Sequence, residues 1–422
     1  MTGDRPSLRV GVNLLWLVPG VVGGSEDYAV GLLTALADAP GRHDRADGVP
    51  PVDLVVFVNR RFADAYPGLC AAFDTVVAPF DGSSRGRRVL GESTWLPRQV
   101  RRRRVEVLHH FGGLVPFNDG AGSGAVPGRR GCVRVLTVHD LQPLDIPANF
   151  SVVKRIFERV AIPWSVRRAD VIVTLGTHVA TTVHDRFGTS PRRFALVAPG
   201  AQRPAAQSAT ADRSATSVDT SGVADRLGLA GHPYFLYPAI TYPHKNHVVL
   251  VEAMARLKRT HPDVRLVLTG GAAGAEADLD ATVQRCGVGE VVLRPGRVSS
   301  DDLGALYAGA TAVVFPSRYE GFGLPVLEAM RLGCPVIAAN TTALPSVVGG
   351  AGILVPPDDV DEWVRAMVLM CDDPVERRRH VAAGRERAAG FTWESSARAL
   401  VGVWRRAAAA AGVGPDVNEG RT

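Results

Sequence analysis

The chain has 422 residues, 46% of them hydrophobic, so it holds enough apolar material for more than one core and its length favours two or three domains. The net charge of +6 is modest for this length and does not by itself indicate nucleic-acid binding, so we expect no nucleic-acid partner. Five cysteines without a Cys-x-x-Cys pair argue against a disulfide framework and against structural zinc. The sequence shows no signal-peptide pattern and no apolar run long enough to span a bilayer, so we expect a cytoplasmic protein.

The first half of the chain alternates apolar, strand-like runs with segments of helical period. Strands are predicted at 8–17, 52–58, 105–109, 133–138, 170–174 and 194–197, and helices at 26–37, 92–104, 156–165 and 179–187. This alternation is typical of an α/β fold with a parallel sheet. After the first strand, Gly23 and Gly24 end a glycine-rich turn whose amides could hold an anion or a hydroxyl. Ordinary turn geometry explains the same glycines equally well.

Two neighbouring polar residues, His139 and Asp140, follow the predicted strand 133–138 and therefore lie at its carboxyl end, where open α/β sheets bind ligands. The histidine could hydrogen-bond a ligand hydroxyl or a leaving oxygen, and the carboxylate could orient it. A histidine with a purely structural hydrogen bond fits the sequence as well. His109 and His110 are predicted to form a strand-to-loop edge on the same side.

The predicted helix 92–104 ends in four arginines: Arg101, Arg102, Arg103 and Arg104. The helix macrodipole favours cations at this end, so a solvated helix terminus is the simpler interpretation. The alternative is docking of an anionic ligand or of an acidic lipid surface, which would give peripheral membrane association.

The second half repeats the alternating pattern after a segment, 203–224, that is rich in Ala, Ser, Thr and Asp and is interpreted as a linker or mobile insertion. We therefore predict a first domain at 1–202, a second at 225–390 and a separate amphipathic helix at 391–410. Strands are predicted at 234–237, 266–269, 291–293, 312–315 and 336–338, and helices at 247–259, 300–308 and 361–370. Asp278 and Asp280 fall in a predicted helix and are interpreted as a solvated face, so no metal site is expected. The tail after residue 410 is expected to be disordered.

One stretch, FPSRYEGFGLPVLEAM at 315–330, combines the end of a buried strand, a glycine-bearing turn and a helix with Pro325 in its first turn. Gly321 and Gly323 allow the backbone to approach a ligand closely. Glu320 in the turn and Glu328 in the helix could serve two parts of one polar ligand. The alternative is a solvated loop acid and a helix surface acid.

This stretch resembles the Glu-x7-Glu signature of the family 4 retaining glycosyltransferases, and further segments carry the likeness over most of the chain: GGSEDYAVGLL, TVHDLQPLDIP, YPHKNH and FTWESSARALVGVWRRA. The resemblance implies a GT-B fold, with two Rossmann-like domains whose parallel sheets face each other across a cleft and a last helix that crosses back to the first domain. It also implies retaining transfer of a sugar from a nucleotide sugar to a hydroxyl-bearing acceptor, with no metal or other cofactor. The spacing of these residues alone implies neither the GT-B fold nor a nucleotide-sugar donor.

The resemblance also assigns roles to particular residues. Glu320 is expected to contact hydroxyls of the donor sugar and Glu328 the ribose, while Gly23 and Gly24 face the acceptor and the donor phosphate. The expected catalytic residues are Glu320, His139, Lys245 and Asp140, and the expected donor-binding residues are Glu328, Arg318, Gly321, Phe322, Gly323, Leu324, Gly270, Gly271 and Thr342.

Two positions depart from the family pattern. Relatives commonly carry an arginine five residues before the motif lysine, where this chain has Ile240, so Lys245 is the evident cation of that turn. Arg318 could supply the second positive charge toward the diphosphate, or it could pair with Glu320. Ser346 stands where the family usually has glutamate, which leaves the contacts of that loop open.

The sequence indicates the identity of the donor and of the acceptor less clearly than the fold. YPHKNH resembles mannosyl- and rhamnosyltransferase-like members, so a GDP-sugar is the first expectation and a UDP- or dTDP-sugar the second. The acceptor could be a polysaccharide, a lipid-linked intermediate or a small metabolite. A sugar-nucleotide epimerase, a trehalose-type synthase and a non-catalytic sugar-nucleotide-binding protein are the alternatives. A nicotinamide dehydrogenase is disfavoured because no Gly-x-Gly-x-x-Gly follows the first strand.

Overall fold

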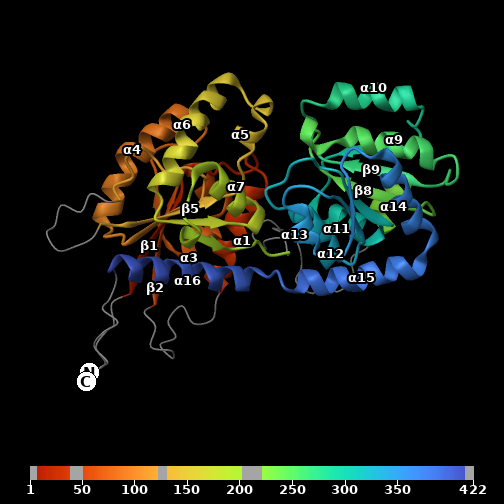
Figure 1. The fold of residues 1–422 in the computed structure, drawn as a ribbon. Coiled ribbons are helices and arrows are strands. Elements are labelled where there is room, and N and C mark those ends of the chain that lie inside the picture. The colour runs from red at the N-terminus through yellow and green to blue at the C-terminus, as the bar shows by residue number, and fades with distance from the viewer. Residues whose placement is uncertain (1–6, 39–50, 122–130, 202–220, 414–422) are drawn as a thin grey trace. The chain divides into compact units, whose positions relative to one another are not determined.

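The structure, a computed structural model, describes residues 7–38, 51–121, 131–201 and 221–413. The chain divides into two compact units (Figure 1). Unit 1 consists of Met1–Ala209 and Thr392–Thr422, and unit 2 is the continuous segment Thr210–Phe391. The chain therefore leaves unit 1, builds all of unit 2 and then returns.

Unit 1 is built on a seven-stranded, entirely parallel sheet of order β3-β2-β1-β4-β5-β6-β7. Its strands are β1 (Leu8–Leu14), β2 (Val52–Val58), β3 (Asp74–Val77), β4 (Val107–His110), β5 (Val133–Val138), β6 (Val171–Thr174) and β7 (Phe194–Leu196). The central strands are runs of valine, leucine and isoleucine because helices cover both faces of such a sheet. The strand order reverses between β1 and β4.

The helices of unit 1 follow the strands along the chain. They are α1 (Gly24–Asp38), α2 (Arg60–Ala65), α3 (Pro67–Ala72), α4 (Arg85–Arg102), α5 (Gln142–Asp145), α6 (Val152–Arg168), α7 (Thr177–Phe187) and the terminal α16 (Trp393–Ala411). Local chemistry sets several of their ends. The Asn59 side chain accepts a hydrogen bond from the Phe62 amide at the start of α2, and Gly188 ends α7 in the left-handed conformation with φ of 63°.

The last helix, α16, packs on α1, β4 and β5 of unit 1. The indole of Trp393 occupies space that a Cβ on Gly31 or on Gly200 would fill, since such atoms would lie 2.4 and 2.7 Å from the ring. Farther along, Trp404 Nε1 donates a 3.1 Å hydrogen bond to His109 Nδ1. Two tryptophans thus hold this helix in place.

Unit 2 has a six-stranded parallel sheet of order β10-β9-β8-β11-β12-β13. Its strands are β8 (Tyr234–Pro238), β9 (Arg265–Thr269), β10 (Val292–Gly296), β11 (Ala312–Phe315), β12 (Val336–Ala339) and β13 (Ile353–Val355). Its helices are α8 (Ser221–Arg226), α9 (His247–Leu257), α10 (Glu276–Cys286), α11 (Ser300–Gly309), α12 (Leu324–Arg331), α13 (Leu344–Val348), α14 (Val360–Asp372) and α15 (Pro374–Ala389). Here the strand order reverses between β8 and β11.

The predicted Rossmann-like α/β architecture with two parallel sheets is confirmed, while several element boundaries were wrong. Helix α4 begins at Arg85 rather than at residue 92, because Ser84 caps it upstream. Strand β4 ends at His110, one residue beyond the predicted end. Residues 221–224 of the predicted linker belong to α8, and 203–220 lie outside the described residues, as does most of the predicted tail. Within the described ranges, no helix is both long and apolar enough to cross a bilayer.

Candidate functional site

In each unit the point where the strand order reverses marks a place for ligand binding, because loops from the two adjacent strands diverge there and leave a crevice at the carboxyl edge of the sheet. In unit 2 the loop after β8 carries Lys245, and the loop after β11 carries the Glu320 turn. Two segments that are far apart in the sequence therefore meet at one sheet edge.

The centre of this edge is an ion pair between Lys245 and Glu320. The distance from Lys245 Nζ to Glu320 Oε1 is 2.6 Å, and the two side chains are 19% and 12% exposed, so the pair is mostly withdrawn from water but still reachable. The lysine backbone is held by Tyr237, whose hydroxyl donates a 2.7 Å hydrogen bond to the Lys245 carbonyl. Lys245 lies in the short turn Pro243–Lys245 just before α9.

Asn246 fixes the turn that presents Lys245. Its backbone is left-handed, with φ of 56°, a conformation that asparagine tolerates better than most residues. Its side-chain amide donates to the carbonyl of Pro357 at 2.7 Å and to Asp358 Oδ1 at 3.2 Å. The lysine turn is thereby tied to the loop that follows β13.

Arg318 does not pair with Glu320, so that alternative was wrong. Its guanidinium pairs with Asp358, at 2.6 Å from Nη2 to Oδ1. The two side chains are 47% and 62% exposed, so this is a solvated pair of small energetic value. Arg318 can therefore exchange its partner for a ligand anion at low cost.

The turn between Glu320 and α12 is held from outside by Thr342, which lies in the loop after β12. The Glu320 amide donates to Thr342 Oγ1 at 3.1 Å, and Thr342 itself has φ of 50°. Gly323 has φ of 108°, and the helix starts at Leu324 with Pro325 in its first turn, as predicted. The unpaired amides of a helix start favour anions.

The other predicted donor-binding residues have different surroundings. Glu328 lies on α12 and accepts a 3.2 Å hydrogen bond from the hydroxyl of Tyr307 on α11. Phe322 is buried and packs against Phe391, which is a core role. Gly270 has φ of 142° and a Cβ there would lie 2.3 Å from the Ala239 carbonyl oxygen, so close packing explains this glycine.

Gly271 lies next to the same turn, and its carbonyl accepts a hydrogen bond from the Thr241 amide at 3.2 Å. Two histidines flank Lys245, and both are neutral at neutral pH. Burial, with a further contribution from the Lys245 charge, lowers the pKa of His244 to about 4. Burial outweighs a hydrogen bond to the Ala239 carbonyl and lowers the pKa of His247 to about 4. Lys245 is therefore the positive group of its turn.

In unit 1, His139 lies just after β5 as predicted. Its Nε2 donates a 2.7 Å hydrogen bond to the Phe111 carbonyl, and its ring meets Tyr28 edge-on at 5.4 Å. Burial lowers the pKa of His139 to about 4, although the Phe111 hydrogen bond opposes the shift. The ring is therefore neutral, with Nδ1 left as a hydrogen-bond acceptor. Asp140 accepts a 2.9 Å hydrogen bond from the Gln142 amide and so stabilises the start of α5.

The glycine turn after β1 is organised by Glu26, which sequence reasoning missed. Gly23 has φ of 62°, and Gly24 is the first residue of α1. Glu26 is buried, and its carboxylate accepts hydrogen bonds from the Gly20 amide at 2.8 Å and from the Tyr66 hydroxyl at 2.6 Å. A carboxylate in the first turn of a helix was the available signal.

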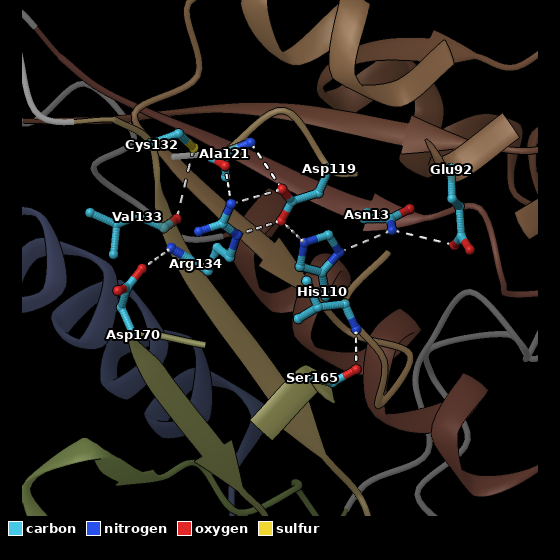
Figure 2. A network of polar contacts seen from close by, with 11 residues as sticks. Asn13, Glu92, His110, Asp119, Ala121, Cys132, Val133, Arg134, Ser165 and Asp170 are labelled. Carbon is cyan, nitrogen blue, oxygen red and sulfur yellow. Dashed lines mark hydrogen bonds and ion pairs between the residues drawn. The ribbon is translucent and has the colours of Figure 1, made fainter. Parts of the chain in front are cut away.

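A second group that the sequence did not reveal lies where β1 meets β4 (Figure 2). Asn13 Oδ1 accepts from the Leu15 amide, so its Nδ2 must be the atom that donates to His110 Nδ1 at 3.2 Å. His110 Nε2 then carries the proton and donates to Asp119 Oδ2 at 3.3 Å. Burial alone would raise the pKa of Asp119, but His110 and Arg134 outweigh it and lower the pKa.

Glu92 on α4 closes this network, because its Oε1 accepts from Asn13 Nδ2 at 3.4 Å. Burial raises the pKa of Glu92, opposed by Arg88, His110 and Asn13. The signal in the sequence was a lone acid in a basic segment. Among the described residues there is no group of three or more His, Cys, Asp or Glu side chains able to hold a metal ion.

Two family models match complementary parts of the chain: "Glycosyltransferase Family 4" at residues 22–202 and "Glycosyl transferases group 1" at residues 226–387. The first covers most of unit 1 and the second most of unit 2. The chain belongs to the family 4 glycosyltransferases of the GT-B type.

Curated relatives include an O-antigen chain mannosyltransferase B of Escherichia coli, 37% identical over 43% of this chain and 48% of the relative. Another is an MMP alpha-(1->4)-mannosyltransferase of Mycolicibacterium hassiacum, 32% identical over 58% of this chain and 56% of the relative. Several D-inositol 3-phosphate glycosyltransferases are also similar. The one from Salinispora arenicola is 31% identical over 58% of this chain and 57% of the relative. The chain spans about half the length of the curated relatives it matches.

Solved structures resemble the whole chain. A sucrose-phosphate synthase from Thermosynechococcus elongatus aligns with a TM-score of 0.69 and 21% identity over 95% of this chain and 99% of that one. Anabaena HepE in complex with UDP and glucose aligns with a TM-score of 0.66 and 19% identity over 94% and 99%. At these identities the likeness establishes the fold alone.

Proposed function

We propose that this protein transfers a sugar from a nucleotide-diphosphate sugar to a hydroxyl group of an acceptor, with retention of the anomeric configuration. The observation that carries the proposal is the mostly buried but reachable Lys245–Glu320 pair, in which one cation and one carboxylate share the sheet edge with the start of α12. A nucleotide sugar presents the matching groups, namely an anionic diphosphate and a ring of hydroxyls.

In the proposed reaction the bond from the sugar C1 to the diphosphate oxygen breaks, and a bond from C1 to the acceptor oxygen forms. The acceptor proton leaves with the diphosphate. Lys245 stabilises the charge that develops on the leaving diphosphate, helped by amides at the start of α12 and by Arg318. Glu320 exchanges Lys245 for hydroxyls of the sugar and orients the reacting centre.

The remaining residues take supporting roles in this proposal. Glu328 accepts hydrogen bonds from the ribose through one carboxylate oxygen, while the Tyr307 hydroxyl donates to the other. In unit 1, the neutral His139 accepts a hydrogen bond from a sugar or acceptor hydroxyl through Nδ1. Gly23 and Gly24 hold the acceptor or a phosphate on their amides. No metal is required, because lysine and helix amides supply the positive charge.

The first choice of donor is a GDP-linked mannose-like sugar. Two of the curated relatives are named mannosyltransferases, in agreement with the likeness of YPHKNH to that branch. The structural neighbours named with UDP, UDP-glucose or glucose support a UDP-sugar as the second choice. Sugar-nucleotide epimerisation and binding without turnover remain the alternative functions.

A panel of nucleotide sugars, each incubated with and without mono- and oligosaccharide acceptors, tests the proposal. Release of nucleoside diphosphate that depends on acceptor supports transfer, and the NMR coupling constant at the new anomeric centre tests retention. Interconversion of the sugar in the absence of acceptor would support an epimerase. Binding of nucleoside diphosphate with no turnover on any donor would support a binding protein.

A further inference from the structure

Helix α6 is apolar on two faces. One face packs into the unit 1 core with Ile162 and Val166, which contact residues of β5 and β6. The other face carries four exposed aliphatic side chains: Val152 (58% exposed), Val153 (72%), Ile156 (63%) and Val160 (60%). At 3.6 residues per turn these four positions fall on one side of the helix, opposite the buried face. A surface helix normally presents polar residues there.

This row differs from the other exposed aliphatic residues of the described chain. Leu90 on α4 and Val375 on α15 are as exposed, at 64% and 65%, but each is the single such residue on its helix. Scattered single residues need no explanation, whereas a contiguous row marks an interaction surface. The row continues toward aromatic residues, because Trp164 lies one turn after Val160 and packs against the half-exposed Phe117, with the ring centroids 5.5 Å apart.

Positive charge accompanies the row. Glu158 is the one acid of α6, and it is paired with Lys154 at 3.7 Å. Arg155, Arg159 and Arg167 have no ion pair within the described parts of the chain. Arg159 and Arg167 are exposed and, at 3.6 residues per turn, lie beside and within the aliphatic row, whereas Arg155 is half-buried and falls on the side of the buried face. The outer surface of α6 thus combines protruding aliphatic groups with uncompensated guanidinium groups.

We propose that the outer face of α6 docks on the surface of a lipid bilayer that contains anionic lipids. Val153, Ile156 and Val160 enter the layer between headgroups and acyl chains, where their transfer from water is favourable. Arg159 and Arg167 meet the lipid phosphates, whose charge complements theirs. The protein then works as a peripheral membrane protein with α6 lying along the surface.

Other occupants fit this face less well. A second copy of the chain packed symmetrically on the same surface would bring the arginines of the two copies together. A protein partner would ordinarily be anchored by tryptophan, tyrosine or arginine in pockets, and valine is under-represented at such anchors. The arginine run at the end of α4 also fits a membrane less well, because Arg103 is paired with Asp74 and α4 has only Leu90 as an exposed aliphatic residue.

Flotation of the full chain with lipid vesicles tests the proposal. We expect binding to phosphatidylcholine vesicles with one third phosphatidylglycerol and at least tenfold weaker binding to phosphatidylcholine alone. Val153→Asp combined with Ile156→Asp is expected to lower the partition coefficient at least tenfold. Arg159→Gln with Arg167→Gln should lower it several-fold and flatten its dependence on salt. Val375→Asp, an equally exposed valine in unit 2, is the control and should bind as the parent does.

The proposal is overturned if the parent binds neither kind of vesicle. It is also overturned if the double aspartate variant binds as strongly as the parent. So does a parent that is a dimer in solution by light scattering and becomes a monomer on Val153→Asp. Val160→Asp alone is a second variant, so that a folding defect in the double variant, seen by thermal unfolding, still leaves a decisive measurement. Glycosyl transfer to a soluble acceptor is unaffected by these substitutions, so failure here is distinct from failure of the proposed reaction.

Discussion

The two units share one architecture, but the carboxyl edges of their sheets carry different chemistry. At the edge of unit 2, charged side chains meet: Lys245 pairs with Glu320, and Arg318 with Asp358. At the corresponding edge of unit 1, His139 is neutral and lies against Tyr28 and the Phe111 carbonyl. The difference teaches that the fold supplies only the place, while side chains decide whether it suits an anion or a hydroxyl.

The contrast predicts which substitutions will harm catalysis most. Lys245→Ala should lower kcat/KM on the order of a hundredfold or more, since it removes the cation nearest the proposed leaving group. Lys245→Arg should not restore full activity, because a planar fork cannot replace a compact ammonium at the 2.6 Å contact with Glu320.

Lys258 is a matched control because it also pairs with a glutamate, Glu290, but on an exposed surface. Lys258→Ala should leave kcat/KM unchanged. The role of Lys245 would be refuted by an alanine variant that binds nucleoside diphosphate as tightly as the parent in calorimetry and turns over at the parental rate.

Substitution of the two motif glutamates should have different kinetic effects, because Glu320 pairs with Lys245 whereas Glu328 accepts a hydrogen bond from Tyr307. We expect Glu320→Gln to lower kcat by about ten- to a hundredfold with little change in donor affinity. Glu328→Gln should instead weaken donor binding by about tenfold. Steady-state kinetics with varied donor distinguishes the two, and equal loss of kcat with unchanged donor affinity in both variants would contradict the assignment.

The buried histidines predict how stability depends on pH. His139, His244 and His247 have pKa values near 4 in the folded chain, below that of an unfolded histidine, so the folded state binds fewer protons between these values. Their stabilisation is present above pH ~6.5 and is lost as pH falls toward 4. Glu92, whose pKa is raised by burial in the folded chain, acts in the opposite sense. Its contribution to stability is lost as the pH rises above the pKa of an unfolded glutamate.

The three histidines change the free energy of unfolding more than the one glutamate does. Tm should therefore be at least about 5 °C lower at pH 5 than at pH 7. Combining His244→Gln with His247→Gln should reduce this difference, whereas substituting the exposed His184 should not. Calorimetric scans across this range check the sign, and a Tm that rises on acidification would show that these histidines are not held neutral.

The smallest effect is expected at the arginine run of α4. Arg101→Gln with Arg103→Gln should leave turnover on a neutral acceptor within a few-fold, and should cost some stability because Arg103 pairs with Asp74 at 2.5 Å. Turnover at low and high salt is the measurement. A large loss on an anionic acceptor that shrinks at high salt would instead make this run a docking site.

Much of the fold could be predicted because the central strands are short apolar runs that alternate with helical segments. The strand, turn and helix around Glu320 and the place of His139 at a strand end followed from that pattern. Edge strands β3 and β13 were missed because they are short, and β3 holds an aspartate. Helix α15 was missed because it buries few residues and lacks an apolar period.

The pairing of site residues could not be predicted, because it depends on strand order. Lys245 and Glu320 are brought together by the neighbouring strands β8 and β11, and Asn13 meets His110 because β1 lies beside β4. Asp358 became the partner of Arg318 through a loop after β13, a strand that the sequence did not reveal. Local periodicity carries no information on such long-range contacts.

The return of α16 to unit 1 has a consequence for how the protein is made on the ribosome. The slot beside Gly31 and Gly200 stays empty until Trp393 has been synthesised, after the whole of unit 2. The first unit to emerge is thus the last to be completed, and its exposed slot is apolar during that interval. A fragment ending before Thr392 should need chaperones or aggregate, and a peptide of residues 392–413 added in trans should rescue its solubility.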